Sequence, residues 1–200
     1  MSSRYITIER EYGSGGTQIA KELSARTGVP CYGREILEKV SEKHNISIES
    51  IEKYEEKATN SILYSVYLMS QTTKGSSDML TNEGHIYLAE QDVIRTFARK
   101  GSAIFLGHCA SEALKEYDGV VKVFIRCSDE NVKKQRIVDT YGIASHETDL
   151  VRRKFHKKRC NYYSINTERK WRDFNEYDIM LDSAAIGIDG CVSILESLIK

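Results

Sequence analysis

The sequence lacks the segments that mark export or membrane insertion. Its first five residues contain no apolar stretch of the kind found in secretory signals. No run approaches the roughly 20 apolar residues that a membrane-spanning helix needs. Proline is nearly absent as well: Pro30 is the only one, and it disfavours helix at Val29. We therefore expect a cytoplasmic chain without a membrane partner.

Cysteine and histidine are present without a ligand pattern. The five cysteines are odd in number, widely spaced and free of any C-x-x-C pair. This argues against a disulfide framework and a structural zinc site, and it favours free thiols in a reducing compartment. Metal-ligand spacing is also missing among four of the five histidines, His44, His85, His146 and His156.

A net charge of one sign is missing too, because 29 basic and 29 acidic residues cancel. A neutral chain argues against nonspecific nucleic-acid binding, so we expect no nucleic-acid partner. The cations are nevertheless unevenly spread. Eight positions hold six of them, Arg152, Arg153, Lys154, Lys157, Lys158 and Arg159. This cluster indicates a local anion site within a neutral molecule.

The 200 residues suit one folded α/β domain over 1–200, with 40% hydrophobic and 29% charged residues. Buried apolar runs predict strands at 4–9, 102–106, 120–125 and 177–182, with an extended link at 29–32. Helical spacing predicts helices at 15–27, 34–44, from 47 onward, 60–72, 81–99, 109–116, 129–140, 146–162 and 188–199, with a polar loop at 73–78. Strands that alternate with helices predict a parallel sheet covered on both faces.

The most informative segment is the glycine-rich loop over 10–17, between the first predicted strand and the first predicted helix. Such a context holds phosphate through backbone N–H groups and a helix N-terminus. Against the ordinary motif G-x-x-x-x-G-K-[ST], Arg10 stands at the first glycine, Gly16 at the lysine and Thr17 at the hydroxyl position. The loop thus predicts a phosphate site whose positive charge comes from elsewhere. The structural alternative is a tight strand-to-helix turn.

Motifs along nearly the whole chain resemble the cytidylate kinase-like family, relatives of the P-loop nucleoside monophosphate kinases. The resemblance rests on Ile8 to Gly16, Gly107 to Ala110, Lys157 to Tyr163, Trp171, and Tyr177 to Ser183. It implies a three-layer P-loop kinase fold with a helical acceptor-binding insertion at about 33–75 and a basic lid at about 143–172. The implied reaction moves the γ-phosphoryl group of Mg-ATP to a nucleoside monophosphate such as CMP or dCMP.

Phosphoryl transfer depends on positioning and on charge neutralisation, and this assigns roles to the candidates. The predicted donor-phosphate residues are Gly13, Ser14, Gly15, Gly16, Thr17 and Gln18. The Thr17 hydroxyl is the predicted Mg²⁺ ligand. The predicted catalytic cations are Arg10, Arg153, Lys157 and Arg159. The spacing of four puts Arg153 and Lys157 on one helix face, and the resemblance implies that lid cations of this kind, together with arginine forks, stabilise the charge of the transferred group. A solvated helix face, or a surface ion pair for Arg10, is the structural alternative.

The acceptor side departs furthest from the family pattern. Gly33 and Ser111 stand where the family often has aspartate, and His108 stands where it has arginine. Histidine holds a phosphate fully only when protonated, with an unperturbed pKa of about 6.5. The remaining acceptor candidates are Arg34, Gln91 and Arg95, the last two with an exposed helix face as the structural alternative.

Three functional readings stay open on the sequence alone. The first is a kinase of a nucleoside monophosphate, the second is a nucleotide-binding sensor without turnover, and the third is a P-loop kinase of another small acceptor. Small-molecule nucleotides are the expected partners. The Tyr-rich segment 54–72 leaves a homo-oligomer interface open beside an acceptor lid.

Overall fold

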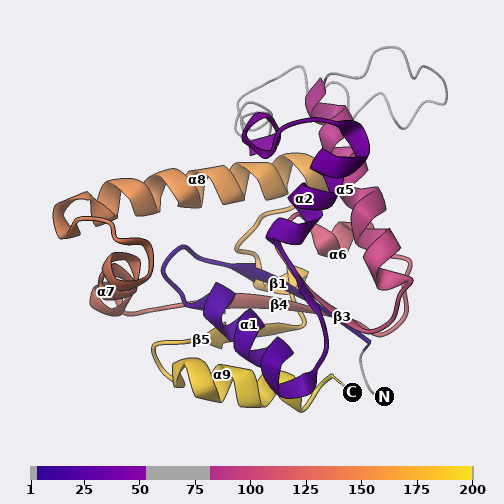
Figure 1. Cartoon of the computed structure of the whole chain (residues 1–200). Helices are drawn as coiled ribbons and strands as arrows, with labels where there is room; N and C mark the ends of the chain where they lie inside the picture. Colours follow the sequence, from indigo (N-terminus) through magenta and orange to yellow (C-terminus); the bar gives the residue numbers. More distant parts are fainter. Residues whose placement is uncertain (1–3, 53–81, 200) are drawn as a thin grey trace.

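The computed structural model describes residues 4–52 and 82–199, and Figure 1 shows their arrangement. The predicted helix at 60–72 and the predicted loop at 73–78 lie outside these residues. All five cysteines lie inside them and are free thiols, as the sequence predicted.

Five parallel strands form the central sheet, in the order β2-β3-β1-β4-β5. Strand β1 lies in the middle and pairs with β3 from Tyr5↔Ala103 onward and with β4 from Tyr5↔Val120 onward. The extended link predicted at 29–32 contains a short edge strand. The strands are β1 (Tyr5–Arg10), β2 (Cys31–Tyr32), β3 (Ala103–Leu106), β4 (Val120–Arg126) and β5 (Ile179–Asp182).

The α-helices follow the predicted order, with corrections at the ends. The predicted helix at 109–116 is only four residues long: Cys109, with a φ of 51°, precedes its start, and Leu114, with a φ of −106° and a ψ of 14°, ends it. The predicted basic helix extends five residues further, to Thr167. The α-helices are α1 (Gly16–Thr27), α2 (Arg34–His44), α5 (Asn82–Ala98), α6 (Ala110–Ala113), α7 (Glu130–Tyr141), α8 (Thr148–Thr167) and α9 (Gly187–Glu196), and residues 48–52 are also helical.

Alternating side chains of the strands build a core on each face of the sheet. Ile6 and Ile8 of β1 are fully buried and belong to the cluster that packs against α1 and α9. Tyr5 and Phe105 point to the opposite face, where they join α2, α5 and α6. Figure 1 shows α1 and α9 on one side of the sheet and α2, α5, α6 and α8 on the other. The predicted three-layer α/β fold is confirmed.

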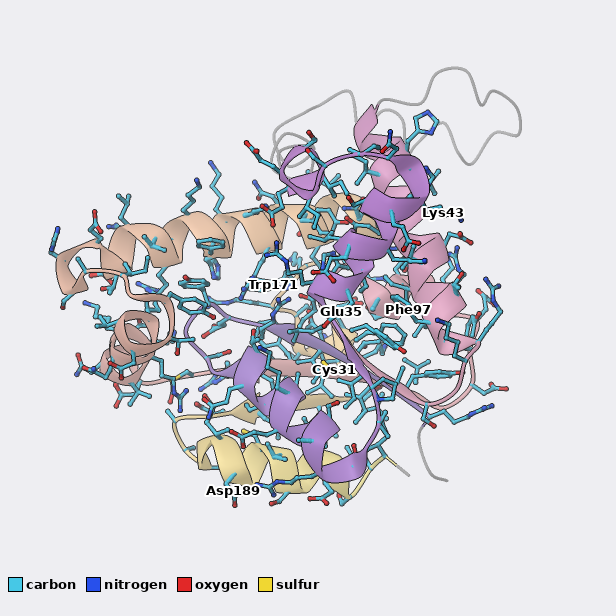
Figure 2. All side chains as sticks on the ribbon, viewed as in Figure 1. Cys31, Glu35, Lys43, Phe97, Trp171 and Asp189 are labelled. Atoms are coloured by element: carbon cyan, nitrogen blue, oxygen red, sulfur yellow. The ribbon has the colours of Figure 1, made fainter. Side chains whose placement is uncertain are left out.

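A third apolar cluster ties the end of α8 and the residues after it to the sheet. Tyr163 and Trp171 are almost fully buried, and Trp171 meets the ring of Phe124 on β4 edge to face. Figure 2 labels Trp171 between α8 and the sheet. The predicted lid at 143–172 therefore contains core residues at its C-terminal end, and lid closure stays a prediction for the part before them.

Candidate active site

The glycine-rich loop lies at the carboxyl end of β1, where the strand order reverses. Gly13 and Gly15 adopt φ of 79° and 78°, and α1 begins at Gly16. The first turn of a helix leaves N–H groups without helical partners, and these groups bind anions. The structure therefore has a strand, a turn and a helix in the arrangement that the phosphate prediction requires.

The Arg10 side chain lies against Gly16, the position of the missing lysine. A Cβ atom at residue 16 would lie 2.6 Å from Cβ of Arg10, far inside van der Waals contact. The Arg10 side chain continues to Gly107, where an added Cβ would lie 2.3 Å from Arg10 Nη1. Arg10 thus fills the space that a side chain at 16 would need, and its guanidinium reaches the end of β3.

Arg159 of α8 approaches the same point from the opposite side. Its Nη1 donates a hydrogen bond to the carbonyl oxygen of Arg10 at 2.9 Å, and its guanidinium carbon lies 5.5 Å from the centre of the Tyr12 ring. Burial, followed by repulsion from Arg10, lowers the pKa of Arg159 from 12.5 to about 9. Two converging guanidinium groups of this kind favour an anion between them.

Two cavities meet at Arg10 and Arg159. The first, of about 360 Å³, lies over the glycine-rich loop, and we call it the donor cavity. The second, of about 510 Å³, lies between α8, the helical residues 48–52 and the ends of β1 and β3, and we call it the acceptor cavity. Arg10 and Arg159 line both cavities. An anion held by this pair is therefore accessible from either side.

An aromatic stack joins the loop to α7 and α8. The Tyr12 ring lies between Tyr141, at 4.8 Å, and Phe155, at 4.5 Å, with interplanar angles of 19° and 4°. Burial, followed by the neighbouring Tyr141, raises the pKa of Tyr12. The stack holds α8 close to the glycine-rich loop and so brings Arg159 to Arg10.

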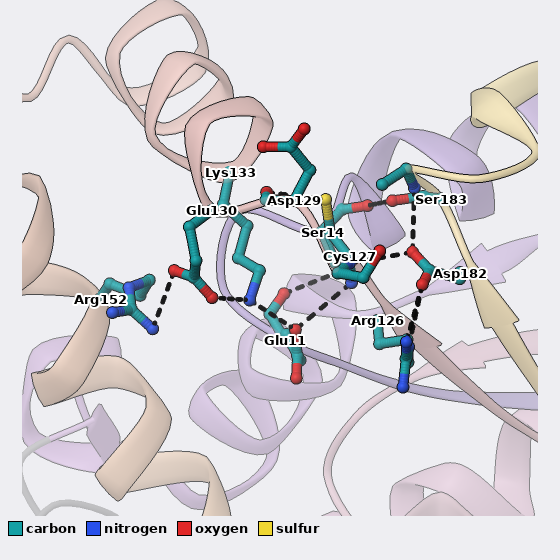
Figure 3. Close-up of polar contacts among 12 residues, drawn as sticks. Glu11, Ser14, Arg126, Cys127, Asp129, Glu130, Lys133, Arg152, Asp182 and Ser183 are labelled. Atoms are coloured by element: carbon teal, nitrogen blue, oxygen red, sulfur yellow. Dashed lines mark hydrogen bonds and ion pairs between the residues drawn. The ribbon is translucent and has the colours of Figure 1, made fainter.

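Polar contacts fix the other side of the loop, as Figure 3 shows. Glu11 is buried and accepts contacts from Lys133 at 3.1 Å and from Arg172. The Ser14 hydroxyl donates to the carbonyl oxygen of Glu11 at 2.9 Å, and the Ser183 hydroxyl donates to the carbonyl oxygen of Ser14 at 2.6 Å. The loop is therefore held by charged and neutral hydrogen bonds before any ligand binds.

Arg136 of α7 is a site residue that the sequence reasoning missed. Its Nη1 donates to the carbonyl oxygen of Ser14 at 3.1 Å and to the hydroxyl of Ser183 at 2.8 Å, and it lines the donor cavity. Helical periodicity predicted α7 but carried no information on which of its cations faces the loop.

We expect Arg136→Ala to lower the free energy of unfolding by about 1.5–3 kcal/mol, the usual contribution of hydrogen bonds to a charged group. Chemical denaturation measures this change. The matched control is Arg126→Ala, because the Arg126 side chain is half-exposed and its Nη2 pairs with the carboxylate of Asp182 at 2.9 Å. Its removal should cost at most about 1 kcal/mol. Equal losses in the two variants would contradict the bracing role of Arg136.

All but one of the predicted donor-phosphate residues line the donor cavity. Ser14 is fully buried and its hydroxyl is turned into the protein, so its side chain does not line the donor cavity. The other predicted residues do line it, and they are Gly13, Gly15, Gly16, Thr17 and Gln18.

The structure separates the predicted cations of α8. Arg159 lines both cavities, whereas Arg153 and Lys157 are exposed and line neither of them. The Nε atom of Arg153 donates to the carbonyl oxygen of Asp149 on its own helix. Two lysines on the inner face, Lys154 and Lys158, line the acceptor cavity instead.

Of the four predicted acceptor residues, only His108 lines the acceptor cavity. Arg34 is exposed at the start of α2 and pairs with Glu38 at 3.4 Å. Arg95 donates from Nε to the carbonyl oxygen of Ala113 at 3.1 Å, which fastens α5 to α6. Gln91 is buried rather than exposed, and it donates to the carbonyl oxygen of His108 at 3.1 Å.

Comparisons with known proteins identify the family. The model of the cytidylate kinase-like family matches residues 5–185. The chain belongs to this family. The resemblance first seen in five sequence motifs is thereby confirmed over most of the length.

Solved structures agree on the fold. An uncharacterised protein from Eubacterium ventriosum ATCC 27560 has a TM-score of 0.71 and 23% identity, with 96% of each chain covered. A shikimate kinase from Bacteroides thetaiotaomicron has a TM-score of 0.51 and 13% identity, with 97% of each chain covered. No curated protein matches the chain. At these identities the structures support the P-loop kinase fold.

The residues of the donor cavity can be compared with the needs of the Mg²⁺ ion that the resemblance implies. Mg²⁺ prefers oxygen ligands and is usually held by one or two protein groups together with substrate phosphates. Thr17 offers a hydroxyl at the start of α1, on the lining of the donor cavity. Within residues 4–52 and 82–199, no cluster of three acidic, cysteine or histidine side chains forms a metal cage. The residues fit a cation that arrives with a nucleotide.

None of the helices within residues 4–52 and 82–199 is long and apolar enough to cross a membrane.

Proposed function

We propose that the chain is a Mg²⁺- and ATP-dependent phosphotransferase. The observation that carries the proposal is the sharing of Arg10 and Arg159 by the two cavities. A phosphoryl group passing from donor to acceptor must cross the point where the two sites meet. Guanidinium groups placed there stabilise the charge that spreads over the phosphoryl oxygens in the transition state.

The donor cavity supplies the remaining contacts for a nucleoside triphosphate. Backbone N–H groups at the start of α1 hold phosphate oxygens, and the Thr17 hydroxyl is the protein ligand proposed for Mg²⁺. The metal ion neutralises phosphate charge when bound. Arg10 and Arg159 replace the positive charge that Gly16 cannot provide.

The family makes a nucleoside monophosphate of the CMP or dCMP type the first acceptor to test. Small-molecule nucleotides are accordingly the proposed partners. A nucleotide sensor without turnover is the second candidate. It is favoured by the departures from the family pattern at Gly33, His108 and Ser111, of which His108 lines the acceptor cavity.

A nucleotide-release assay with a panel of monophosphates tests the proposal, together with calorimetric binding of Mg-ATP. Phosphoryl transfer to any acceptor would support it. Binding of Mg-ATP without transfer to an acceptor or to water would favour the sensor. An absence of ATP binding would exclude both candidates.

The inner and outer cations of α8 give a paired prediction. Lys158→Ala removes a charge from the acceptor cavity, whereas Lys157→Ala removes one from the exposed face. We expect the first change to lower kcat/KM at least about tenfold, through the loss of a charge-assisted contact of about 1.5–3 kcal/mol to an oxygen of the transferred phosphoryl group. The second should change it less than about twofold, as for an exposed charge. Steady-state kinetics with equal protein stability measures both, and the reverse order would restore the sequence-based choice of Lys157.

A further inference from the structure

Glu90 is a buried carboxylate on α5 that the proposed phosphotransfer does not yet use. It is fully buried. Its Oε2 accepts a hydrogen bond from the Tyr162 hydroxyl at 2.5 Å and lies 3.3 Å from Nδ1 of His108. A charge removed from water is retained only where other groups compensate it. Glu90 thus orients two side chains, His108 and Tyr162, and both line the acceptor cavity.

His108 is placed beside the point where the two cavities meet. It follows Gly107, the residue against which the Arg10 guanidinium lies. Its φ of 56° is a left-handed conformation that non-glycine residues adopt at an energetic cost, and such strain clusters at functional sites. Since Nδ1 faces Glu90, Nε2 lies on the ring edge away from this carboxylate.

A carboxylate, an imidazole and a substrate cavity in this order form a base with its orienting group. The carboxylate fixes the tautomer that carries a proton on Nδ1, and Nε2 is then the atom that accepts a proton. A phosphate acceptor has no need of such a base, because its second pKa is about 6 and it is largely deprotonated at neutral pH. A hydroxyl acceptor does need one.

The charges of the acceptor cavity point the same way. Among the described residues, its lining contains two arginines, Arg10 and Arg159, and both are shared with the donor cavity. Lys154 and Lys158 also line the cavity, but they are offset by three carboxylates, Glu9, Glu49 and Glu52. When Arg10 and Arg159 hold the transferred phosphoryl group, the two lysines and three carboxylates that remain leave no excess of cations for the phosphate of a second anion.

We propose that the acceptor reacts through a hydroxyl group, with His108 as the catalytic base and Glu90 as its positioning residue. This inference rests on the proposed phosphotransfer from ATP and narrows the acceptor to the class of alcohols, such as nucleosides and cyclic polyols. The acceptor oxygen forms a bond to the γ-phosphorus while the bond from that phosphorus to the leaving diphosphate oxygen breaks. The electron pair leaves with ADP, the hydroxyl proton passes to Nε2 of His108, and the product is a phosphate monoester.

The experiment uses γ-labelled ATP with two panels of acceptors, nucleosides and cyclic polyols in one and nucleoside monophosphates in the other. An acid-stable phosphate monoester is the expected product. An acid-labile diphosphate formed from a monophosphate would overturn the inference and leave the proposed phosphotransfer intact. Failure to bind ATP would instead remove the proposed function itself.

If neither panel reacts, the rate of ATP hydrolysis tests the inference instead, because water is also a nucleophile that reacts through a hydroxyl group. We expect His108→Asn to slow basal ATP hydrolysis by about 10²-fold or more, the usual range of general-base catalysis, with ATP affinity unchanged. Asparagine tolerates the positive φ at this position, so the variant isolates the loss of the base. An unchanged hydrolysis rate, or an absence of hydrolysis in the parent protein, would overturn the inference.

Two further measurements distinguish a catalytic base at His108 from a cation that only holds a phosphate. His108→Arg keeps a positive charge and should be as slow as His108→Asn, whereas a phosphate-holding role predicts that the reaction rate recovers.

The reaction rate of the parent protein should rise with pH on the acid side of its profile. His108→Asn should lack this rise, and Glu90→Gln should shift it to another pH. Charged and titratable groups that contact His108 or line the cavity with it influence that rise: Glu9, Arg10, Glu49, Glu52, Glu90, Lys154, Lys158, Arg159, Tyr162 and Tyr163. A rise that persists in His108→Asn would contradict the assignment.

Discussion

Arg159→Ala is expected to lower kcat on the order of 10³-fold, the lower end of the effect of a transition-state arginine. The guanidinium lines both cavities, and the proposed transfer places the charge of the phosphoryl group between them. ATP affinity should fall far less, because the backbone donors of the glycine-rich loop remain. Steady-state kinetics for kcat and calorimetry for ATP binding measure the two effects separately.

Arg159→Lys is the informative companion of this variant. Lysine keeps a positive charge but loses the fork that reaches both the phosphoryl group and the carbonyl oxygen of Arg10, which Nη1 contacts at 2.9 Å. We expect partial activity that stays well below the parent. Arg153→Ala serves as the control on the exposed face of the same helix, with kinetics close to the parent. Equal losses of ATP affinity and kcat in Arg159→Ala would assign Arg159 to ground-state binding instead.

The sequence predicted most of the fold because its signals are local. A buried apolar run marks each main strand, and the helix at Arg34–His44 was predicted to the residue. The predicted helix at 129–140 begins beside Asp129, whose carboxylate accepts from the N–H groups of Asn131 and Val132 and so caps it. The short strand β2 was predicted only as an extended link, since two residues are too few for a periodic signal.

The site was harder to predict because it depends on which face of a helix turns inward. On α8 the spacing of four between Arg153 and Lys157 suggested a cationic face, but Arg159 lies on a different one. Phe155 and Tyr162, at four and three residues from Arg159, mark the inner face by their aromatic side chains. This signal was in the sequence and would have selected Lys158 over Lys157.

Long-range contacts carried no local signal. The contact between Glu90 and His108 joins residues 18 apart, and the brace from Arg136 to Ser14 joins residues 122 apart. The sequence also gave no indication that a side chain at position 16 would overlap with Arg10. The sequence showed a missing lysine, whereas only the coordinates show that Arg10 fills its space.

That overlap predicts that an ordinary phosphate-loop lysine cannot be restored alone. Gly16→Lys places a Cβ 2.6 Å from Cβ of Arg10. Such overpacking should lower the free energy of unfolding by about 1–3 kcal/mol. The melting temperature of a chain of this size should then fall about 2–4 °C per kcal/mol. ATP affinity should fall as well, because the displaced Arg10 guanidinium no longer reaches the shared site.

The double variant Arg10→Gly with Gly16→Lys restores both motif positions, G-x-x-x-x-G-K-T, and removes the collision. We expect it to be more stable than Gly16→Lys and to bind ATP more tightly than Arg10→Gly, with a coupling energy of about 0.5–3 kcal/mol between the two sites. The control, Arg10→Ala with Gly16→Lys, differs by a single methyl group. It keeps the Cβ atom at position 10 that collides with Cβ at position 16, so it should remain destabilised. Thermal unfolding and calorimetry measure these differences. Additive effects of the two substitutions, or equal behaviour of the glycine and alanine versions, would show that the absent lysine has another cause than the space occupied by Arg10.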